Sequence, residues 1–224
     1  PNFHNPAGTT LPLERRRLLV EIARKYDLLI VEDDPYGALR YEGEDITPIA
    51  RMAPERTLYL GTFSKTLTPG LRIGWVTGPE GILSRLVQTK QGVDLHTSTL
   101  DQMITNCVVQ SGILAEHIES LRATYGQRRD TMLDAMVEFW PDGCNWTRPE
   151  GGLFLWARLP DQIDTVEMLT TALANKVAYV PGVNFYPYAD GGFNTMRLNF
   201  SNAQPAMIVE GIRRLGNAIK DAMK

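Results

Sequence analysis

Lys65 lies among residue types that suit chemistry on an anionic small molecule. The stretch GTFSKTLTPGLR, at 61–72, follows the apolar run at 57–60, which predicts a buried strand. Thr62 and Ser64 place hydroxyl groups just before Lys65, and Arg72 follows beyond a Thr-Pro-Gly turn. A guanidinium and hydroxyls suit a phosphate, and the lysine amine suits Schiff-base formation. The alternatives without a chemical role are a surface position for Lys65 and a surface ion pair for Arg72.

A second group of polar residues follows the apolar run at 28–31. Asp33 comes at the end of this run, and Tyr36 follows three residues later. We expect Asp33 to be a buried carboxylate that keeps a ring nitrogen protonated, with the Tyr36 phenol in the same site. The alternatives are a strand-end turn or a helix N-cap for Asp33, and ordinary core packing for Tyr36.

Arg197 is a charged residue inside the apolar run at 196–200. An arginine in such a strand needs an anionic partner or a cavity. A bidentate grip on a substrate carboxylate and a structural salt bridge explain it equally well from the strand alone. The three histidines, His4, His96 and His117, are scattered and form no triad or metal-binding pattern.

A helix followed by a fully apolar strand begins the chain and predicts a parallel α/β sheet. In the helical pattern at 11–26, the apolar face is expected to contain Leu18, Leu19, Ile22 and Ala23, and Arg16 is expected on the polar side. Further strands are predicted at 57–60 and 72–76. Carboxylates at the carboxyl end of such a strand lie where open α/β sheets bind ligands.

A long helical pattern at 115–139 is predicted to bridge two domains. It follows two shorter helical patterns and precedes a mixture of short strands and helices. We therefore predict a large-domain portion at 1–115, with a mostly parallel sheet, and a smaller α+β domain at 116–224. The expected elements are helices at 80–91, 100–111, 165–176 and 205–223 and strands at 151–156, 178–180 and 196–200.

The composition is that of a globular, cytosolic protein. The 224 residues are 43% hydrophobic and 22% charged, with a net charge of -3, so the chain can bury a core. No basic run points to nucleic acid, and no apolar run approaches the ~18 residues of a membrane span. Cys107 and Cys144 are far apart in the sequence, which indicates reduced thiols and a cytoplasmic location.

Four motifs in this order resemble those of the class I/II aminotransferases, the fold-type I enzymes that depend on pyridoxal 5'-phosphate. The motifs are NPAG at 5–8, DDPY at 33–36, Ser64-Lys65 with Arg72, and Arg197 within MRLNFS. The phrases PNFHNPAG, VEDDPYGALRY and RPEGGLFLWARLP resemble the subgroup of 2-aminoadipate and kynurenine-type aminotransferases. The same subgroup includes the C-terminal module of MocR-type transcription regulators.

The resemblance implies a role for each motif residue. Lys65 would form the Schiff base with the cofactor and move the proton at the substrate Cα. Asp33 would pair with the pyridinium nitrogen, and Tyr36 and Asn5 with the phenolic oxygen of the cofactor. The substrate carboxylate would be bound by Arg197, with Asn5 beside it. The phosphate would be held by Thr62, Ser64 and Arg72.

The resemblance also implies an incomplete site, because family members carry a further upstream stretch. That stretch supplies another phosphate-binding loop and an aromatic residue that stacks on the cofactor ring, so we expect this chain to be a C-terminal portion. The expected function is a ping-pong transfer of an amino group from an amino acid to a 2-oxo acid, in a homodimer. The alternatives are an effector-sensing module of a MocR-type regulator and a related cofactor-dependent lyase.

Overall fold

The computed structural model describes residues 1–224 as two compact units. The first comprises Pro1–Asn2 and Thr10–Leu121, and the second comprises Phe3–Thr9 and Arg122–Lys224. The helix α5 (Ile113–Phe139) contributes residues to both units. The predicted domain division at 115/116 stays a prediction.

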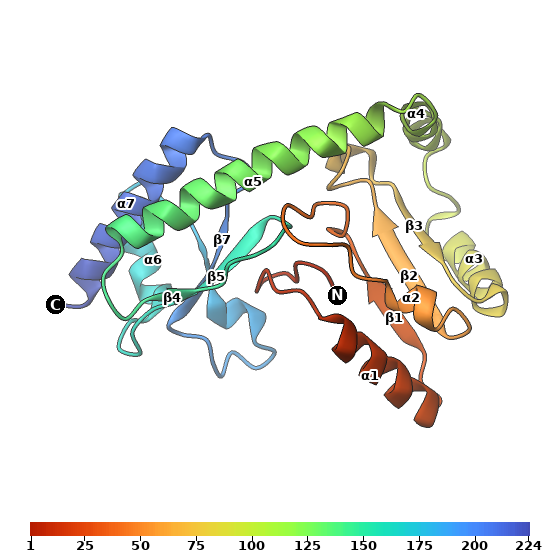
Figure 1. Ribbon diagram of the computed structural model, residues 1–224, viewed down its shortest axis with the longest axis horizontal. Helices are drawn as coiled ribbons and strands as arrows, with labels where there is room; N and C mark the ends of the chain where they lie inside the picture. The colour runs from red at the N-terminus through yellow and green to blue at the C-terminus, as the bar shows by residue number, and fades with distance from the viewer. The chain divides into compact units, whose positions relative to one another are not determined.

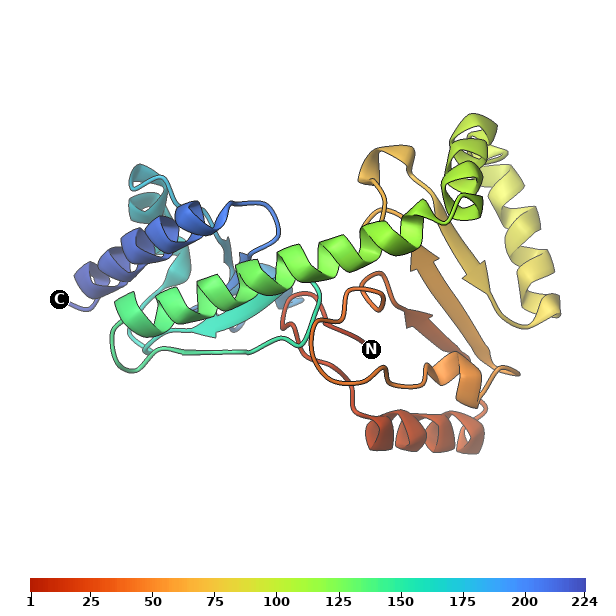
Figure 2. The same ribbon diagram turned by 45° about the horizontal axis from the view of Figure 1, so that its top comes forward.

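The first unit contains a three-stranded sheet in the order β1-β2-β3 (Figures 1 and 2). β1 pairs with β2 in parallel, whereas β3 is antiparallel to β2. The carboxyl ends of β1 and β2 therefore lie at the same edge of the sheet. The elements are α1 (Leu13–Lys25), β1 (Ile30–Asp33), α2 (Ile49–Met52), β2 (Thr57–Thr62), a short 3-10 helix (Pro69–Leu71), β3 (Gly74–Thr77), α3 (Glu80–Asp94) and α4 (Thr99–Gln110).

The buried face of α1 matches the predicted one only at Ala23. Leu18, Leu19 and Ile22 are 52%, 37% and 44% exposed, whereas Val20 packs with Ala23 in a core that includes residues of β1 and α2. Arg16, expected on the polar side, is fully buried. Burial of this guanidinium is tolerated because it donates to the carbonyl oxygens of residues 11, 46 and 47 and to the Asn2 side chain.

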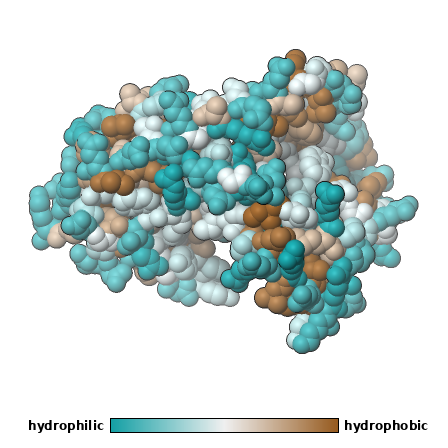
Figure 3. Space-filling model, in the orientation of Figure 1, coloured by the Kyte–Doolittle hydropathy of each residue, from teal (hydrophilic) through white to brown (hydrophobic).

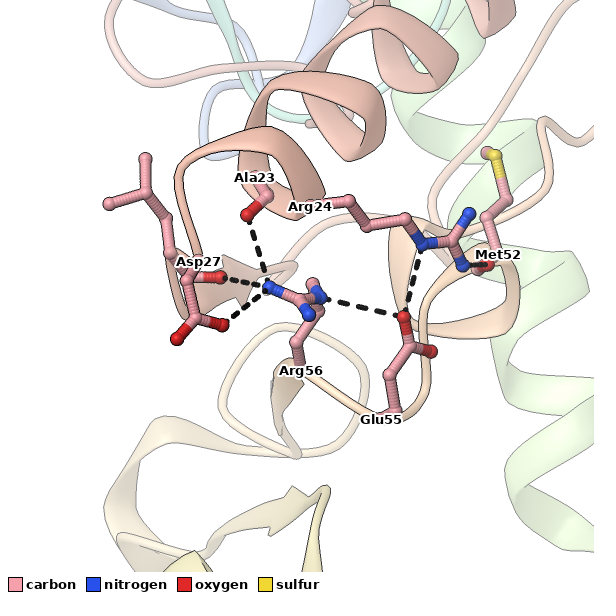
Figure 4. Close-up of polar contacts among 7 residues, drawn as sticks. Ala23, Arg24, Asp27, Met52, Glu55 and Arg56 are labelled. Atoms are coloured by element: carbon pink, nitrogen blue, oxygen red, sulfur yellow. Dashed lines mark hydrogen bonds and ion pairs between the residues drawn. The ribbon is translucent and has the colours of Figure 1, made fainter.

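A cluster of ion pairs joins the end of α1 to the start of β2 (Figure 4). Arg56 donates to the Ala23 carbonyl at 3.0 Å and lies 3.5 Å from both Asp27 and Glu55. Arg24 pairs with the same Glu55 at 3.2 Å. Arg56 also accepts a backbone hydrogen bond from the first residue of β1, at 2.9 Å. The cluster thus helps to fix where β1 and β2 begin relative to each other.

The second unit contains an antiparallel four-stranded sheet in the order β4-β5-β7-β6. Its core includes Leu155, Met196, Phe200, Leu215 and Ile219, which have no exposed surface. The elements are the C-terminal part of α5, β4 (Asn145–Trp146), β5 (Phe154–Arg158), α6 (Thr165–Ala174), β6 (Val180–Pro181), a 3-10 helix (Gly182–Phe185), β7 (Thr195–Asn199) and α7 (Pro205–Ala222).

The segment Phe3–Thr9 packs into the second unit although it comes from the start of the chain. Phe3 is 1% exposed and contacts Gly152, where an added Cβ atom would lie 2.5 Å from the Phe3 Cβ. Gly8 approaches the backbone of β5 similarly, since a Cβ there would lie 2.5 Å from the Phe154 carbonyl oxygen. Both glycines have positive φ, so a side chain at either position would also strain the backbone.

Two glycines of α7 give a matched test of the helix packing in the second unit. A Cβ at Gly216 would lie 2.6 Å from the Phe139 carbonyl at the end of α5, whereas a Cβ at Gly211 would meet nothing within 4 Å. We expect Gly216→Ala to lower the free energy of unfolding by about 1–3 kcal/mol. Gly211→Ala should raise it by roughly 0.5–1 kcal/mol, because alanine favours helix. Denaturant unfolding of the full-length protein measures both, and equal effects would contradict this packing.

Many large hydrophobic side chains are exposed, and Figure 3 shows such residues in brown on one face of the molecule. On α3 and α4 they include Val87, Val93, Leu100 and Met103, which are 59%, 79%, 67% and 62% exposed. None of the helices combines the length and the hydrophobicity needed to cross a membrane. No group of three or more His, Cys, Asp or Glu side chains is arranged to hold a metal ion.

Candidate active site

The end of β2 and the turn that follows hold the two predicted hydroxyl groups in contact. The Thr62 hydroxyl lies 3.0 Å from the Ser64 hydroxyl and donates to the Ile73 carbonyl at 3.1 Å. The Ser64 amide donates to the Thr62 oxygen at 3.1 Å. Two backbone hydrogen bonds to the Phe63 carbonyl, from residues 67 and 68, close the turn. The turn that carries Lys65 is therefore fixed at both of its ends.

Lys65 is half-buried within this turn, and its amine forms no hydrogen bond or ion pair with the rest of the chain. A lysine at a structural position normally pairs with a carboxylate or extends into water. The Lys65 amine has no partner of either kind in the chain and is available to a ligand, and the residue follows the Thr62–Ser64 pair directly in the sequence. The chemical role of Lys65 therefore stays a prediction.

Asp33 is the last residue of β1, and its Cα atom is the register partner of that of Leu60. Its carboxylate thus lies at the edge of the sheet from which β2 continues to Thr62. The expectation that the side chain is buried is wrong for this chain, because Asp33 is exposed and has no partner within it. Side chains alternate along a strand, and the buried carboxylates are Glu32 and Asp34, at 2% and 8% exposure.

Tyr36 and Arg72 complete the residues predicted in the first unit. Tyr36 is 7% exposed, and its carbonyl accepts a hydrogen bond from the Leu39 amide at 2.8 Å. Arg72 ends the short 3-10 helix with a φ of 57°, and its guanidinium donates to the Pro69 carbonyl at 3.1 Å. Arg72 is exposed and forms no ion pair, so the surface ion pair considered as its alternative is not formed.

Arg197 and Asn5 are brought together in the second unit from opposite ends of the chain. The Arg197 guanidinium donates to the Asn5 side-chain oxygen at 2.8 Å. It also lies over the rings of Phe154 and Phe185, at 4.3 Å and 5.2 Å from their centres. Neutral neighbours on these sides orient the guanidinium without neutralising its charge. Such a side chain is suited to a carboxylate ligand.

A buried polar network forms around Asp34, the residue after Asp33, and the sequence did not predict it. Asp34 accepts hydrogen bonds from Tyr59 at 2.9 Å and from Asn2 at 3.0 Å, and Asn2 accepts one from Arg16 at 2.5 Å. Burial, followed by the charge of Asp34, raises the pKa of Tyr59. Burial lowers the pKa of Arg16, although Glu32 and Asp34 oppose this shift. The alternation along β1 is the sequence signal that places Asp34 opposite to Asp33.

The residues of the first unit fit a phosphate ester that carries an aldehyde and a basic ring nitrogen. An unpaired amine, an unpaired carboxylate and two hydroxyls in contact lie at or beyond the carboxyl ends of β1 and β2. The amine suits a carbonyl, the carboxylate suits a protonated ring nitrogen, and the hydroxyls suit phosphate oxygens. These are the groups that pyridoxal 5'-phosphate presents.

Comparison with known proteins gives matches over nearly the whole chain. The family model described as aminotransferase class I and II matches residues 1–215. An aromatic-amino-acid aminotransferase of Thermococcus litoralis is 51% identical over 225 residues, which cover 100% of this chain and 54% of that protein. The solved structure of LysN, an alpha-aminoadipate aminotransferase from Thermus thermophilus, is complexed with N-(5'-phosphopyridoxyl)-L-leucine. It is 38% identical with a TM-score of 0.93, covering 100% of this chain and 58% of that chain.

A transcription regulator matches as well. The uncharacterized HTH-type regulator YisV of Bacillus subtilis is 33% identical over 224 residues, which cover 100% of this chain and 46% of the regulator. The chain thus spans about half the length of the curated relatives that it matches.

Proposed function

Because this chain belongs to the class I and II aminotransferases, we propose that the protein transfers an amino group from an amino acid to a 2-oxo acid with pyridoxal 5'-phosphate. The resemblance and the α/β fold class predicted from the sequence are confirmed by these relatives. The observation that carries the proposed chemistry is the unpaired amine of Lys65 beside the Thr62–Ser64 pair, at the sheet edge that also bears Asp33.

The residues of the first unit would hold the cofactor and move protons. When bound, pyridoxal phosphate supplies an electron sink that stabilises negative charge at the substrate Cα. The Lys65 Nζ atom would bind the cofactor and later move the proton from the substrate Cα to the C4′ atom of the cofactor. Asp33 would keep the ring nitrogen protonated. Thr62, Ser64 and Arg72 would donate hydrogen bonds to the phosphate oxygens.

The substrate carboxylate and the phenolic oxygen of the cofactor would be bound by Asn5, Tyr36 and Arg197. Arg197 would bind the α-carboxylate of the amino acid through two parallel hydrogen bonds. Its hydrogen bond to Asn5 and its contacts with Phe154 and Phe185 support this role, because they fix the plane of the guanidinium. Asn5 would also donate to the phenolic oxygen, as would the phenol of Tyr36.

We further propose that the protein is cytoplasmic and that it forms a homodimer, as is typical of the family. The exposed hydrophobic side chains of α3 and α4 support an assembly that covers them. Sedimentation of the full-length protein measures this state, and a monomer at micromolar concentration would contradict it.

A half-reaction tests the proposed function. The full-length protein, loaded with pyridoxal phosphate, is mixed with one amino acid and no 2-oxo acid, and the products are measured by mass spectrometry. We expect one equivalent of the 2-oxo acid per subunit, and further turnover only after a second 2-oxo acid is added. A panel with aromatic amino acids and 2-aminoadipate identifies the substrate class.

The same experiment separates the two alternatives. A regulator module, favoured by the match to YisV, would bind pyridoxal phosphate without releasing a 2-oxo acid and would bind DNA through residues outside this chain. A lyase would form many equivalents of product without an added 2-oxo acid. Either result would contradict an aminotransferase.

A further inference from the structure

Asp34 lies next to Asp33 but points to the opposite side of β1. It is 8% exposed, and one of its carboxylate oxygens accepts hydrogen bonds from the Tyr59 hydroxyl and the Asn2 amide. The other carboxylate oxygen is buried without a partner in the chain. A buried carboxylate with an unsatisfied oxygen is costly, so stability alone does not explain it.

The network around Asp34 connects three separate segments of the first unit. Tyr59 lies in the middle of β2 and is in ring contact with Trp75 of β3, at 5.4 Å between ring centres. Asn2 is held in turn by Arg16, which is fully buried in α1. Through Asp34, the point where the chain leaves β1 is therefore attached to both β2 and α1.

The backbone beyond Asp34 closes directly over its carboxylate. A Cβ atom at Gly37 would lie 2.3 Å from the oxygen of Asp34 that accepts the two hydrogen bonds. Only glycine leaves room for this approach. The Asp34 amide also donates to the Leu60 carbonyl at 3.0 Å, so the residue is fixed through both its backbone and its side chain. The segment at 33–36, which leads out of β1, is consequently held in place at Asp34.

We propose that Asp34 is a positioning residue, which through its accepted hydrogen bonds holds the segment at 33–36 so that Asp33 and Tyr36 meet the cofactor in the required orientation. The inference rests on the proposed function, because those two residues contact pyridoxal phosphate only under that proposal. The proposed role depends on the two accepted hydrogen bonds, whose donors are a neutral hydroxyl and a neutral amide and which any accepting oxygen at this place can accept.

The test compares variants of the full-length protein with pyridoxal phosphate labelled with ¹⁵N in its ring. We expect Asp34→Ala to weaken cofactor binding by about 10–100-fold, the effect of losing two such hydrogen bonds in a buried site. We also expect the ¹⁵N resonance to move toward that of an unprotonated ring, because Asp33 no longer faces the nitrogen. Asp34→Asn keeps an accepting oxygen and should remain within about threefold of the wild type. Gly37→Ala, which displaces the carboxylate, should resemble Asp34→Ala.

Glu32→Ala is the matched control. Glu32 is a second buried carboxylate on the same face of β1, and it accepts from the amides of Ile49 and Ala50 at 2.9 Å and 2.7 Å. Its removal should lower stability while the ¹⁵N shift and cofactor affinity stay those of the wild type. A wild-type shift and affinity in Asp34→Ala, or in Gly37→Ala if Asp34→Ala does not fold, would overturn the inference. Equal changes in Glu32→Ala would overturn it as well. A wild-type protein that binds no pyridoxal phosphate would contradict the proposed function itself.

Discussion

Alanine in place of Lys65 will leave the full-length protein without pyridoxal phosphate that borohydride can fix to the chain. Transamination should fall by at least ~10²–10⁴-fold, which is the usual contribution of a proton-transferring side chain alone. The reason is that the amine of Lys65 has no partner in the protein, and alanine supplies neither a nucleophile nor a base. Borohydride reduction followed by peptide mass mapping measures the attachment, and steady-state kinetics measures the rate.

Lys90→Ala is a suitable control for this experiment. Lys90 is another lysine of the first unit, but its amine is paired with Asp94 at 2.8 Å on the surface of α3. Its replacement should leave both cofactor attachment and rate unchanged. If the Lys65→Ala protein still carried a reducible cofactor on another lysine, the assignment of Lys65 would be wrong.

Replacing Arg197 by leucine should raise KM for the amino acid by about 100-fold and change the dissociation constant of pyridoxal phosphate by less than about threefold. The expected loss of about 3 kcal/mol is that of a charge-assisted, two-pronged hydrogen bond to a carboxylate. Asn5 is unchanged in this variant, but its side chain is neutral and cannot form a charge-assisted hydrogen bond with the carboxylate. Titration of the cofactor-free protein with pyridoxal phosphate, together with kinetics over a range of amino-acid concentrations, separates the two quantities.

Arg158 provides the matched control for Arg197. It lies on the neighbouring strand β5, where its Cα pairs with that of Thr195, and it is exposed. Arg158→Leu should leave both quantities at their wild-type values. Losses of equal size in cofactor affinity and substrate affinity on replacing Arg197 would instead indicate that this residue serves the fold, as in the salt-bridge alternative.

The sequence predicted the elements that have strong periodic patterns. The long helix expected at 115–139 is Ile113–Phe139, and the strand expected at 57–60 continues to Thr62. By contrast, the apolar run at 28–31 predicts a strand, but β1 begins only at Ile30, where pairing with β2 starts. Leu28 and Leu29 before it are about half exposed, and Val31 within β1 is 60% exposed. An apolar run predicts residues that are buried in the folded protein. It does not say whether other residues of this chain bury them.

Only those parts of the site whose residues are close together in the sequence could be predicted to lie together. The hydroxyls, Lys65 and Arg72 lie within one short stretch, so their neighbourhood could be expected. The burial of Asp34 in place of Asp33 depends on which face of β1 packs against α1 and α2, and a run of three acidic residues does not reveal that face. The contact between Asn5 and Arg197 joins residues 192 positions apart, and no local pattern carries such information.

The assignment of Phe3–Thr9 to the second unit has a consequence for how the chain is synthesised and folded. Phe3 and Asn5 leave the ribosome well before Gly152 and Arg197, which they contact. The second unit therefore cannot be completed during translation until Arg197 has emerged. Contacts of such large sequence separation also slow folding. A polypeptide that begins at residue 122 would lack the buried Phe3 ring, so this unit is not a contiguous piece that can be excised intact.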